Sequence, residues 1–461
     1  MAFELTFHGA AEQVTGSLYV LRAGASTVVV ECGLIQGGRE AEARNADPLP
    51  VAVDSIDAVV LSHAHIDHTG RLPLLFKQGY DGPVYVQRAT RALCEIMLPD
   101  SGYLNEKDAE WENRKREAKG QPLVEPLYTR EEAEQSLALF EGLGYGEPTT
   151  IAPGLTLTFH DAGHILGSAI VELRYDDEGR ERTLVFSGDL GYHESPVMND
   201  PATLQHADAV LMESTYGDRQ HRPYAETLEE LGDVFETARA AQGNIMIPAF
   251  TVGRTQDLLY LMAKHHDEWR LDKWHIFLDS PMGIEATDAY ARFRHLYGVQ
   301  LFETDSRQPD LPNFHATRTT EESMTINEIR SGAIIIAGSG MCSGGRIHHH
   351  LRNNIWRPEC HLVIVGYQAQ GTLGRRLVDG ADEIRLFGDT YKVRARIHTI
   401  GGLSAHADQQ GLIDWYAAFD NRPPVYLVHG EARAQVPLLE RLRSELSAPA
   451  SIARYGQTIA I

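Results

Sequence analysis

Lysine, cysteine and long apolar runs are all scarce in this sequence. Only seven of its 42 basic residues are lysines, and 64 acidic residues give the chain a net charge of −22. Such a chain lacks the basic character that general nucleic-acid-binding proteins carry. Its basic residues are mostly arginine, which favours bidentate contacts with phosphate. The composition is therefore compatible with a local basic site on an otherwise acidic protein.

The sequence carries no signal for export or membrane insertion. Its first ten residues, MAFELTFHGA, contain neither the basic nor the apolar part of a signal peptide. It has no apolar run of the roughly 18 residues that a membrane span needs. Its four cysteines form no C-x-x-C pair, which predicts buried thiols of a reducing compartment. We therefore expect a cytoplasmic protein without a membrane partner.

The predicted elements change in character along the chain. Short strands separated by glycine turns fill roughly the first 90 residues, as in FELTFHG, SLYVLRAG, STVVVECG and DAVVLSHAH. Helices are predicted over residues 105–119 and 129–143, and strands such as LTLTFHDAGH follow them. From about residue 225, short apolar strands alternate with helices, which is typical of a parallel α/β fold. A chain of 461 residues with this pattern predicts two or three domains.

The clearest chemical signal is the segment Ser62-His63-Ala64-His65-Ile66-Asp67-His68, which follows the apolar strand DAVVL. Imidazole and carboxylate groups are ligands that zinc accepts. In an extended segment His63 and His65 point to the same face, so one metal ion can take this pair while Asp67 and His68 serve a second. The alternative is a polar loop, but with 21 histidines among 461 residues chance rarely produces this spacing.

Two metal ions need more ligands than this loop provides, and three further candidates follow apolar strands. They are His164, Asp189 and His429, each beside a glycine that lets the backbone approach a site closely. A single histidine at a strand end is more often a hydrogen-bonded structural residue. Recurrence at three strand ends favours the interpretation as ligands.

The H-x-H-x-D-H motif resembles that of the metallo-β-lactamase superfamily, and the resemblance extends along the whole chain. It implies an αββα sandwich with two zinc ions, or manganese as an alternative, which activate a water molecule as the nucleophile. The sequence departs from the family at Glu31, where an aspartate usually supports the metal loop. The resemblance implies that the first ion is bound by His63, His65 and His164. It implies that the second ion is bound by Asp67, His68 and His429, and that Asp189 binds both ions.

Three later motifs resemble motifs A, B and C of the β-CASP group within this superfamily. They are Glu213-Ser214-Thr215-Tyr216-Gly217, Ser404-Ala405-His406-Ala407-Asp408 and Val428-His429-Gly430-Glu431. The segments PAFTVGRTQDLL, GSGMCSGGR and GYQAQGTLG also resemble that group. The resemblance implies an α/β β-CASP domain inserted into the sandwich, with the active site in the cleft between them. We expect residues 1–210 and 396–461 to form the metallo-β-lactamase domain and residues 211–395 to form the β-CASP domain.

The resemblance implies a metal-dependent ribonuclease that cuts single-stranded RNA and leaves 5′-phosphate and 3′-hydroxyl ends, in RNA processing or decay. The β-CASP group includes the pre-messenger-RNA 3′-end endonuclease and its bacterial and archaeal relatives. The N-terminal KH domains of the archaeal relatives are not expected, because the first strand begins near residue 3. His429 favours RNA, since DNA-acting members usually carry another residue there. Catalytic roles are expected for Asp67 in the metal site and for His406 as a general acid that Glu213 keeps protonated.

Two other functions stay open as alternatives. A non-catalytic β-CASP scaffold subunit would have lost metal ligands, and a small-molecule hydrolase, for example of thioesters, would lack so long an insertion. The sequence does not distinguish endonucleolytic from 5′-exonucleolytic cleavage. A homodimer is consistent with the family.

The glycine-rich segment 338–346 is a candidate phosphate site, because backbone N–H groups of such turns can face an anion. A tight turn without a ligand is the alternative. Adjacent helical residues point in different directions, so His348, His349 and His350 are interpreted as a helix face and not as a metal site. The candidate phosphate contacts are Arg254, Ser339, Gly340, Arg346 and Ser404.

Overall fold

A computed structural model describes residues 3–193, 195–299, 301–302 and 309–461. The chain divides into two compact units. The first, called here the sandwich unit, comprises Met1–His193, Asp200–Gln220 and His406–Ile461, and the second, the parallel-sheet unit, comprises Glu194–Asn199 and His221–Ala405. The chain thus leaves the sandwich unit after residue 220 and returns to it at residue 406. Each of these points lies about ten residues after the boundary expected from the sequence.

The sandwich unit contains two seven-stranded sheets. In each sheet four neighbouring strands run parallel and the other pairings are antiparallel. The first sheet has the order β22 (Thr458–Ala460), β1 (Phe3–Phe7), β2 (Tyr19–Ala23), β3 (Ser26–Val30), β4 (Ala58–Val60), β5 (Val84–Gln87) and β6 (Phe140–Leu143). The second has the order β21 (Ala450–Ile452), β20 (Val425–Leu427), β11 (Ala209–Met212), β10 (Arg180–Phe186), β9 (Ala169–Asp177), β8 (Leu155–Asp161) and β7 (Thr149–Ala152).

The main core of this unit lies between the two sheets. Alternate residues of β1, such as Leu5 and Phe7, pack with Leu155, Leu157 and Phe186 of the second sheet in one buried cluster. Side chains of a strand alternate between its two faces, so one set of apolar residues from each sheet fills this layer. A second cluster buries the outer face of β11 and β20 under α12 (Gln409–Ala417) and α13 (Ala432–Leu446).

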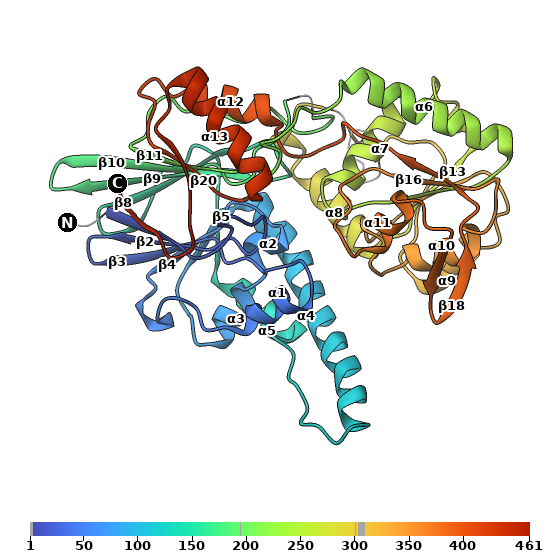
Figure 1. Ribbon diagram of the computed structural model, residues 1–461, viewed down its shortest axis with the longest axis horizontal. Helices are drawn as coiled ribbons and strands as arrows, with labels where there is room; N and C mark the ends of the chain where they lie inside the picture. Colours follow the sequence, from blue (N-terminus) through green and yellow to red (C-terminus); the bar gives the residue numbers. More distant parts are fainter. Residues whose placement is uncertain (1–2, 194, 300, 303–308) are drawn as a thin grey trace. The chain divides into compact units, whose positions relative to one another are not determined.

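Helices of the N-terminal segment lie on the other side of the sandwich, so the unit has the αββα order that the family resemblance predicts (Figure 1). The helix predicted over 105–119 is the second half of a single 30-residue helix. The helix predicted over 129–143 was too long, because residues 140–143 form β6 at the edge of the first sheet. The helices on this side are α1 (Arg39–Ala43), α2 (Ile66–Thr69), α3 (Leu72–Lys77), α4 (Arg88–Glu117) and α5 (Arg130–Ser136).

The parallel-sheet unit is built on a six-stranded sheet whose pairings are all parallel. Its central strands are continuous apolar runs, as expected for a sheet with both faces covered. The strand order is β14 (Phe314–Ala316), β13 (His275–Leu278), β15 (Ala333–Ala337), β12 (Ile245–Pro248), β16 (His361–Ile364) and β19 (Arg396–Thr399). The hairpin of β17 (Glu383–Leu386) and β18 (Asp389–Lys392) is separate, and the helices are α6 (Tyr224–Ala241), α7 (Arg254–Lys264), α8 (Pro281–Arg292), α9 (Thr320–Ile326), α10 (Ile347–Asn354) and α11 (Leu373–Val378).

Within the described part of the chain, no helix has the length and apolar composition needed to cross a membrane.

Candidate metal centre

The seven expected ligands come together within the sandwich unit. Four lie in the loop after β4 and in α2, and the others follow β8, β10 and β20. Strands β8, β10 and β20 run in the same direction, so their carboxyl ends meet at one edge of the second sheet. Close backbone packing holds the α2 loop in place, since a Cβ on Gly33 would lie 1.6 Å from the backbone oxygen of Asp67. Glycine is therefore required at position 33.

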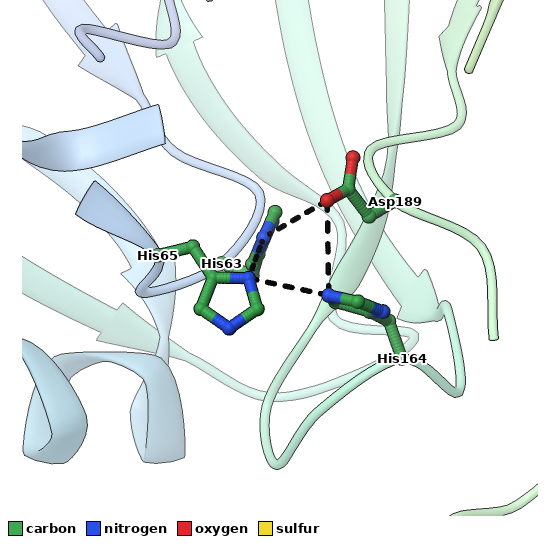
Figure 2. A group of neighbouring side chains, drawn as sticks. All are labelled: His63, His65, His164 and Asp189. Atoms are coloured by element: carbon green, nitrogen blue, oxygen red, sulfur yellow. Dashed lines mark hydrogen bonds and ion pairs between the residues drawn. The ribbon is translucent and has the colours of Figure 1, made fainter. Parts of the chain in front are cut away.

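One group of side chains consists of His63, His65, His164 and Asp189, whose ligand atoms lie within 4.8 Å of one another (Figure 2). Nδ1 of His65 lies 3.0 Å from Nε2 of His63 and 3.2 Å from Nε2 of His164. Oδ2 of Asp189 lies 3.4 Å from Nε2 of His63 and 3.7 Å from Nε2 of His164. Two imidazoles thus present Nε2 and one presents Nδ1 to a common point.

A second group consists of Asp67, His68 and His429. Nε2 of His429 lies 3.2 Å from Nε2 of His68 and 3.3 Å from Oδ2 of Asp67. Asp189 links the two groups, because its Oδ2 also lies 3.5 Å from Nε2 of His68. The backbone of His429 has a left-handed φ of 49°, which turns this side chain immediately after β20.

The donor atoms have the spacing that a tetrahedral zinc ion needs. With Zn–N bonds of about 2.0–2.1 Å, two ligand nitrogens lie roughly 3.3 Å apart. The nitrogen pairs of both groups are 3.0–3.2 Å apart. Among the described residues none donates a hydrogen bond to the buried Oδ1 of Asp189, and Nδ1 of His429 lies 3.5 Å from it. A buried carboxylate oxygen without such a donor suits a cation, so the residues fit the implied metal ions.

Three of the histidines have a fixed partner on the ring nitrogen that does not face another ligand histidine. Nδ1 of His68 contacts Glu31, and Nδ1 of His63 lies 3.0 Å from Oγ of Ser62. The Ser62 hydroxyl in turn donates to Glu31. Nδ1 of His429 lies 3.0 Å from Oγ1 of Thr215. A partner on one ring nitrogen selects the tautomer whose other nitrogen carries the lone pair.

The environment of the group sets the charge of its members. Burial and the neighbouring His68 lower the pKa of His63 to about 3, and burial lowers the pKa of His65 to about 4. Burial alone would raise the pKa of Asp189, but the histidines around it, His429 first, hold its pKa well below the usual range. At neutral pH His63 and His65 are therefore neutral imidazoles and Asp189 is an ionised carboxylate, the forms that bind metal. Burial would lower the pKa of His68, but the carboxylates of Asp189, Asp67 and Glu31 raise it well above the ordinary value.

Glu213 and His406 lie beside these groups. Oε1 of Glu213 lies 3.1 Å from Nδ1 of His406 and also accepts the backbone N–H of Leu190 at 2.7 Å. The segment of His406 is bound to the same loop, because Ala407 donates its N–H to Leu190 O. Burial lowers the pKa of His406, but the Glu213 and Asp189 carboxylates raise it, to about 9 overall. His406 is therefore a cation at neutral pH.

The structure does not gather the expected phosphate contacts in the same way. Arg254 is buried and forms an ion pair with Asp257 at 3.0 Å. Arg346 pairs with the buried Asp279 at 2.6 Å and also donates to two backbone carbonyls. Ser339 and Gly340 lie in the turn after β15, and Ser404 lies two residues before His406 in the half-buried segment 404–406. Both arginines thus use their guanidinium groups inside the parallel-sheet unit.

Comparisons with known proteins agree with this geometry. Residues 12–249 match the metallo-beta-lactamase superfamily, residues 255–377 match the Beta-Casp domain, and residues 390–453 match a Zn-dependent metallo-hydrolase RNA specificity domain. Ribonuclease TTHA0252 of Thermus thermophilus is 40% identical, over 98% of this chain and 99% of that protein. The chain belongs to the β-CASP group of the metallo-β-lactamase superfamily.

Two further proteins are similar to this β-CASP protein. Transcription termination factor FttA of Methanothermobacter thermautotrophicus is 32% identical over 93% of this chain and 67% of that protein. A solved protein of unknown function from Enterococcus faecalis V583 has a TM-score of 0.57 at 14% identity over the full length of both chains, which supports the fold alone.

Sequence reasoning assigned no role to two side chains of this β-CASP site, Ser62 and Thr215. Both occur inside motifs that were noticed, directly before His63 and two residues after Glu213. Their contacts with ligand histidines depend on side-chain direction, and Thr215 reaches across 214 residues of sequence to His429. The sequence signal for both side chains is a hydroxyl residue inside a motif that carries a ligand or catalytic residue. Glu31, at the position where the family resemblance predicts an aspartate, contacts His68.

Proposed function

We propose that this protein is a metal-dependent ribonuclease that hydrolyses single-stranded RNA to 5′-phosphate and 3′-hydroxyl ends. The observation that carries the proposal is the convergence of seven ligand side chains beside the Glu213–His406 pair. The 40% identity with a protein named as a ribonuclease supports RNA as the substrate. The match of residues 390–453 to an RNA specificity domain supports the same substrate.

The two groups would each hold one divalent cation, with Asp189 contributing to both. His63, His65 and His164 would bind one ion, and Asp67, His68 and His429 the other. Zinc suits this mixture of imidazole and carboxylate ligands, and manganese is the alternative. When bound, the ions supply Lewis acidity and activate a water molecule at neutral pH.

Residues of this chain orient the metal ligands and supply the proton for the leaving group. Ser62, Glu31 and Thr215 orient the imidazoles of three ligands, so that their lone pairs face the ions. His406 carries the proton that the departing 3′ oxygen of the RNA needs, and Glu213 keeps that proton on the ring. The 2′-hydroxyl has no part in an attack by water, so the cut leaves a 5′-phosphate.

RNA labelled at either end tests the proposal. Wild type should cut both substrates to products with 5′-phosphate and 3′-hydroxyl ends, and the pattern of fragments should distinguish endonucleolytic from 5′-exonucleolytic cleavage. Asp67→Ala, which removes one carboxylate ligand, should show no cleavage. Full activity after chelation and desalting, or thioester hydrolysis without RNA cleavage, would contradict the proposal.

We further propose a cytoplasmic location, which the four free and buried cysteines support. The homodimer stays a prediction from the family, and light scattering of the purified protein tests it directly.

A further inference from the structure

Three loops meet at the carboxyl edge of the central strands in the parallel-sheet unit. Residues 249–253 follow β12, residues 338–346 follow β15, and residues 366–372 come after β16. Strand β12 pairs with both β15 and β16 in parallel, so the three loops are neighbours. The chain order changes direction at β12, since β13 and β14 lie on one side of it and β16 and β19 on the other. Open α/β sheets bind ligands at such an edge.

Two large aromatic side chains are exposed on these loops. Phe250 is 40% exposed and Tyr367 is 49% exposed. The ring of Phe250 is seated against glycine backbone, because a Cβ on Gly340 would lie 2.9 Å from its Cδ2 and one on Gly366 3.4 Å from its Cε2. The ring is therefore supported by two loops and still presents surface to solvent.

Hydrogen bonds hold these loops together. The buried side chain of Gln368 donates to the carbonyl of Gly340 at 2.9 Å, which ties the third loop to the second. Thr255 binds the Phe250 carbonyl through its hydroxyl at 2.7 Å. A supported aromatic ring loses little freedom when a flat ligand stacks on it.

The charge of the three loops favours a polyanion. Residues 249–253, 338–346 and 366–372 contain no aspartate or glutamate, although 64 of the 461 residues of the chain are acidic. Asp257 and Asp279, which pair with Arg254 and Arg346, are buried. These three loops therefore add no acidic repulsion of their own against RNA on a chain whose net charge is −22.

We infer that Phe250 and Tyr367 form a stacking platform for the bases of single-stranded RNA. This inference rests on the proposed ribonuclease function and adds a base-binding site to it. Bases stack on aromatic rings without strong sequence preference, because every base has a π face.

Binding of a fluorescein-labelled single-stranded RNA to chains that also carry Asp67→Ala tests this platform without cleavage. Phe250→Ala and Tyr367→Ala should each weaken binding about 5- to 100-fold, and Phe250→Trp should restore it. An abasic oligomer of equal length should bind the Asp67→Ala chain and its Phe250→Ala form equally, since it has no base to stack.

Trp356→Ala is the matched control, because Trp356 is 45% exposed in the same unit but precedes β16 and so lies toward the opposite edge of the sheet. It should bind RNA like the parent chain. Unchanged binding by Phe250→Ala and Tyr367→Ala would overturn the inference. Cleavage of RNA by the chain without Asp67→Ala is scored separately, so failure of the platform and failure of the ribonuclease proposal give different results. Melting curves of each variant verify that it is folded.

Discussion

Glu213 Oε1 lies 3.1 Å from Nδ1 of His406, although 193 residues separate them in sequence. Glu213 follows β11 and is buried, whereas the His406 side chain is 20% exposed. The buried Glu213 carboxylate thus contacts Nδ1 of His406, and part of the imidazole ring stays accessible to solvent. This arrangement suits a residue that exchanges protons with a substrate.

Replacement of His406 by alanine should lower the rate of RNA cleavage by about 10²–10⁴, the usual contribution of a general acid. The metal content should stay the same, because His406 is not among the seven proposed ligands. His160→Ala is a suitable control, since His160 also pairs with a carboxylate, Glu172, at 2.6 Å, but on the open sheet surface of β8 and β9. Equal rates for wild type and His406→Ala would remove the general acid from the mechanism.

Glu213→Gln should change the dependence of the rate on pH. An acid works in its protonated form, so activity is lost as pH rises through the pKa of His406, which the structure places at about 9. Without the negative charge of Glu213 this pKa falls, and the alkaline limb of the kcat profile should move to lower pH by about one unit or more. An alkaline limb that stays in place would show that another group controls it.

Thr215 gives a test of metal binding that does not depend on activity. Its hydroxyl lies 3.0 Å from Nδ1 of His429 and is the partner that fixes this tautomer. Thr215→Val has a similar shape without the hydroxyl and should lower the affinity for one metal ion about 10- to 100-fold, whereas Thr215→Ser should keep it. Equilibrium dialysis against a zinc chelator measures both. If valine and serine variants bind equally, the contact is not an orienting one.

The sequence predicted the sandwich and the gathering of ligands better than it predicted individual contacts. The HAHIDH segment and three strand-end residues were sufficient, because parallel strands bring their carboxyl ends to one edge. The phosphate contacts show the limit of such reasoning. Arg254 and Arg346 are near the expected turns, but each meets a buried aspartate that only the packed structure brings to it.

The edge of the first sheet shows a second limit. Residues 140–143 complete a sequence whose local pattern indicates a helix, yet they pair with β5 and form β6. Pairing with a neighbouring strand supplies hydrogen bonds that no local pattern reveals.

Removal of metal should lower the melting temperature by several degrees, and addition of zinc should restore it. A ligand that binds only the folded state stabilises it, by about 4 kcal/mol at a thousandfold excess over Kd. The half-buried carboxylate of Asp67 and the buried carboxylate of Asp189 would otherwise repel each other inside the site. Differential scanning calorimetry with and without a chelator measures the difference. An unchanged melting temperature would contradict a metal held by these residues.

The number of metal ions bound per chain tests the central claim most directly. Elemental analysis by mass spectrometry of purified wild type and of His429→Ala, both dialysed against trace zinc, supplies this number. The account predicts about two ions per wild-type chain, from two ligand groups that share Asp189, and about one in the variant. A wild-type chain that binds no stoichiometric metal, or a variant that still holds two ions, would contradict it.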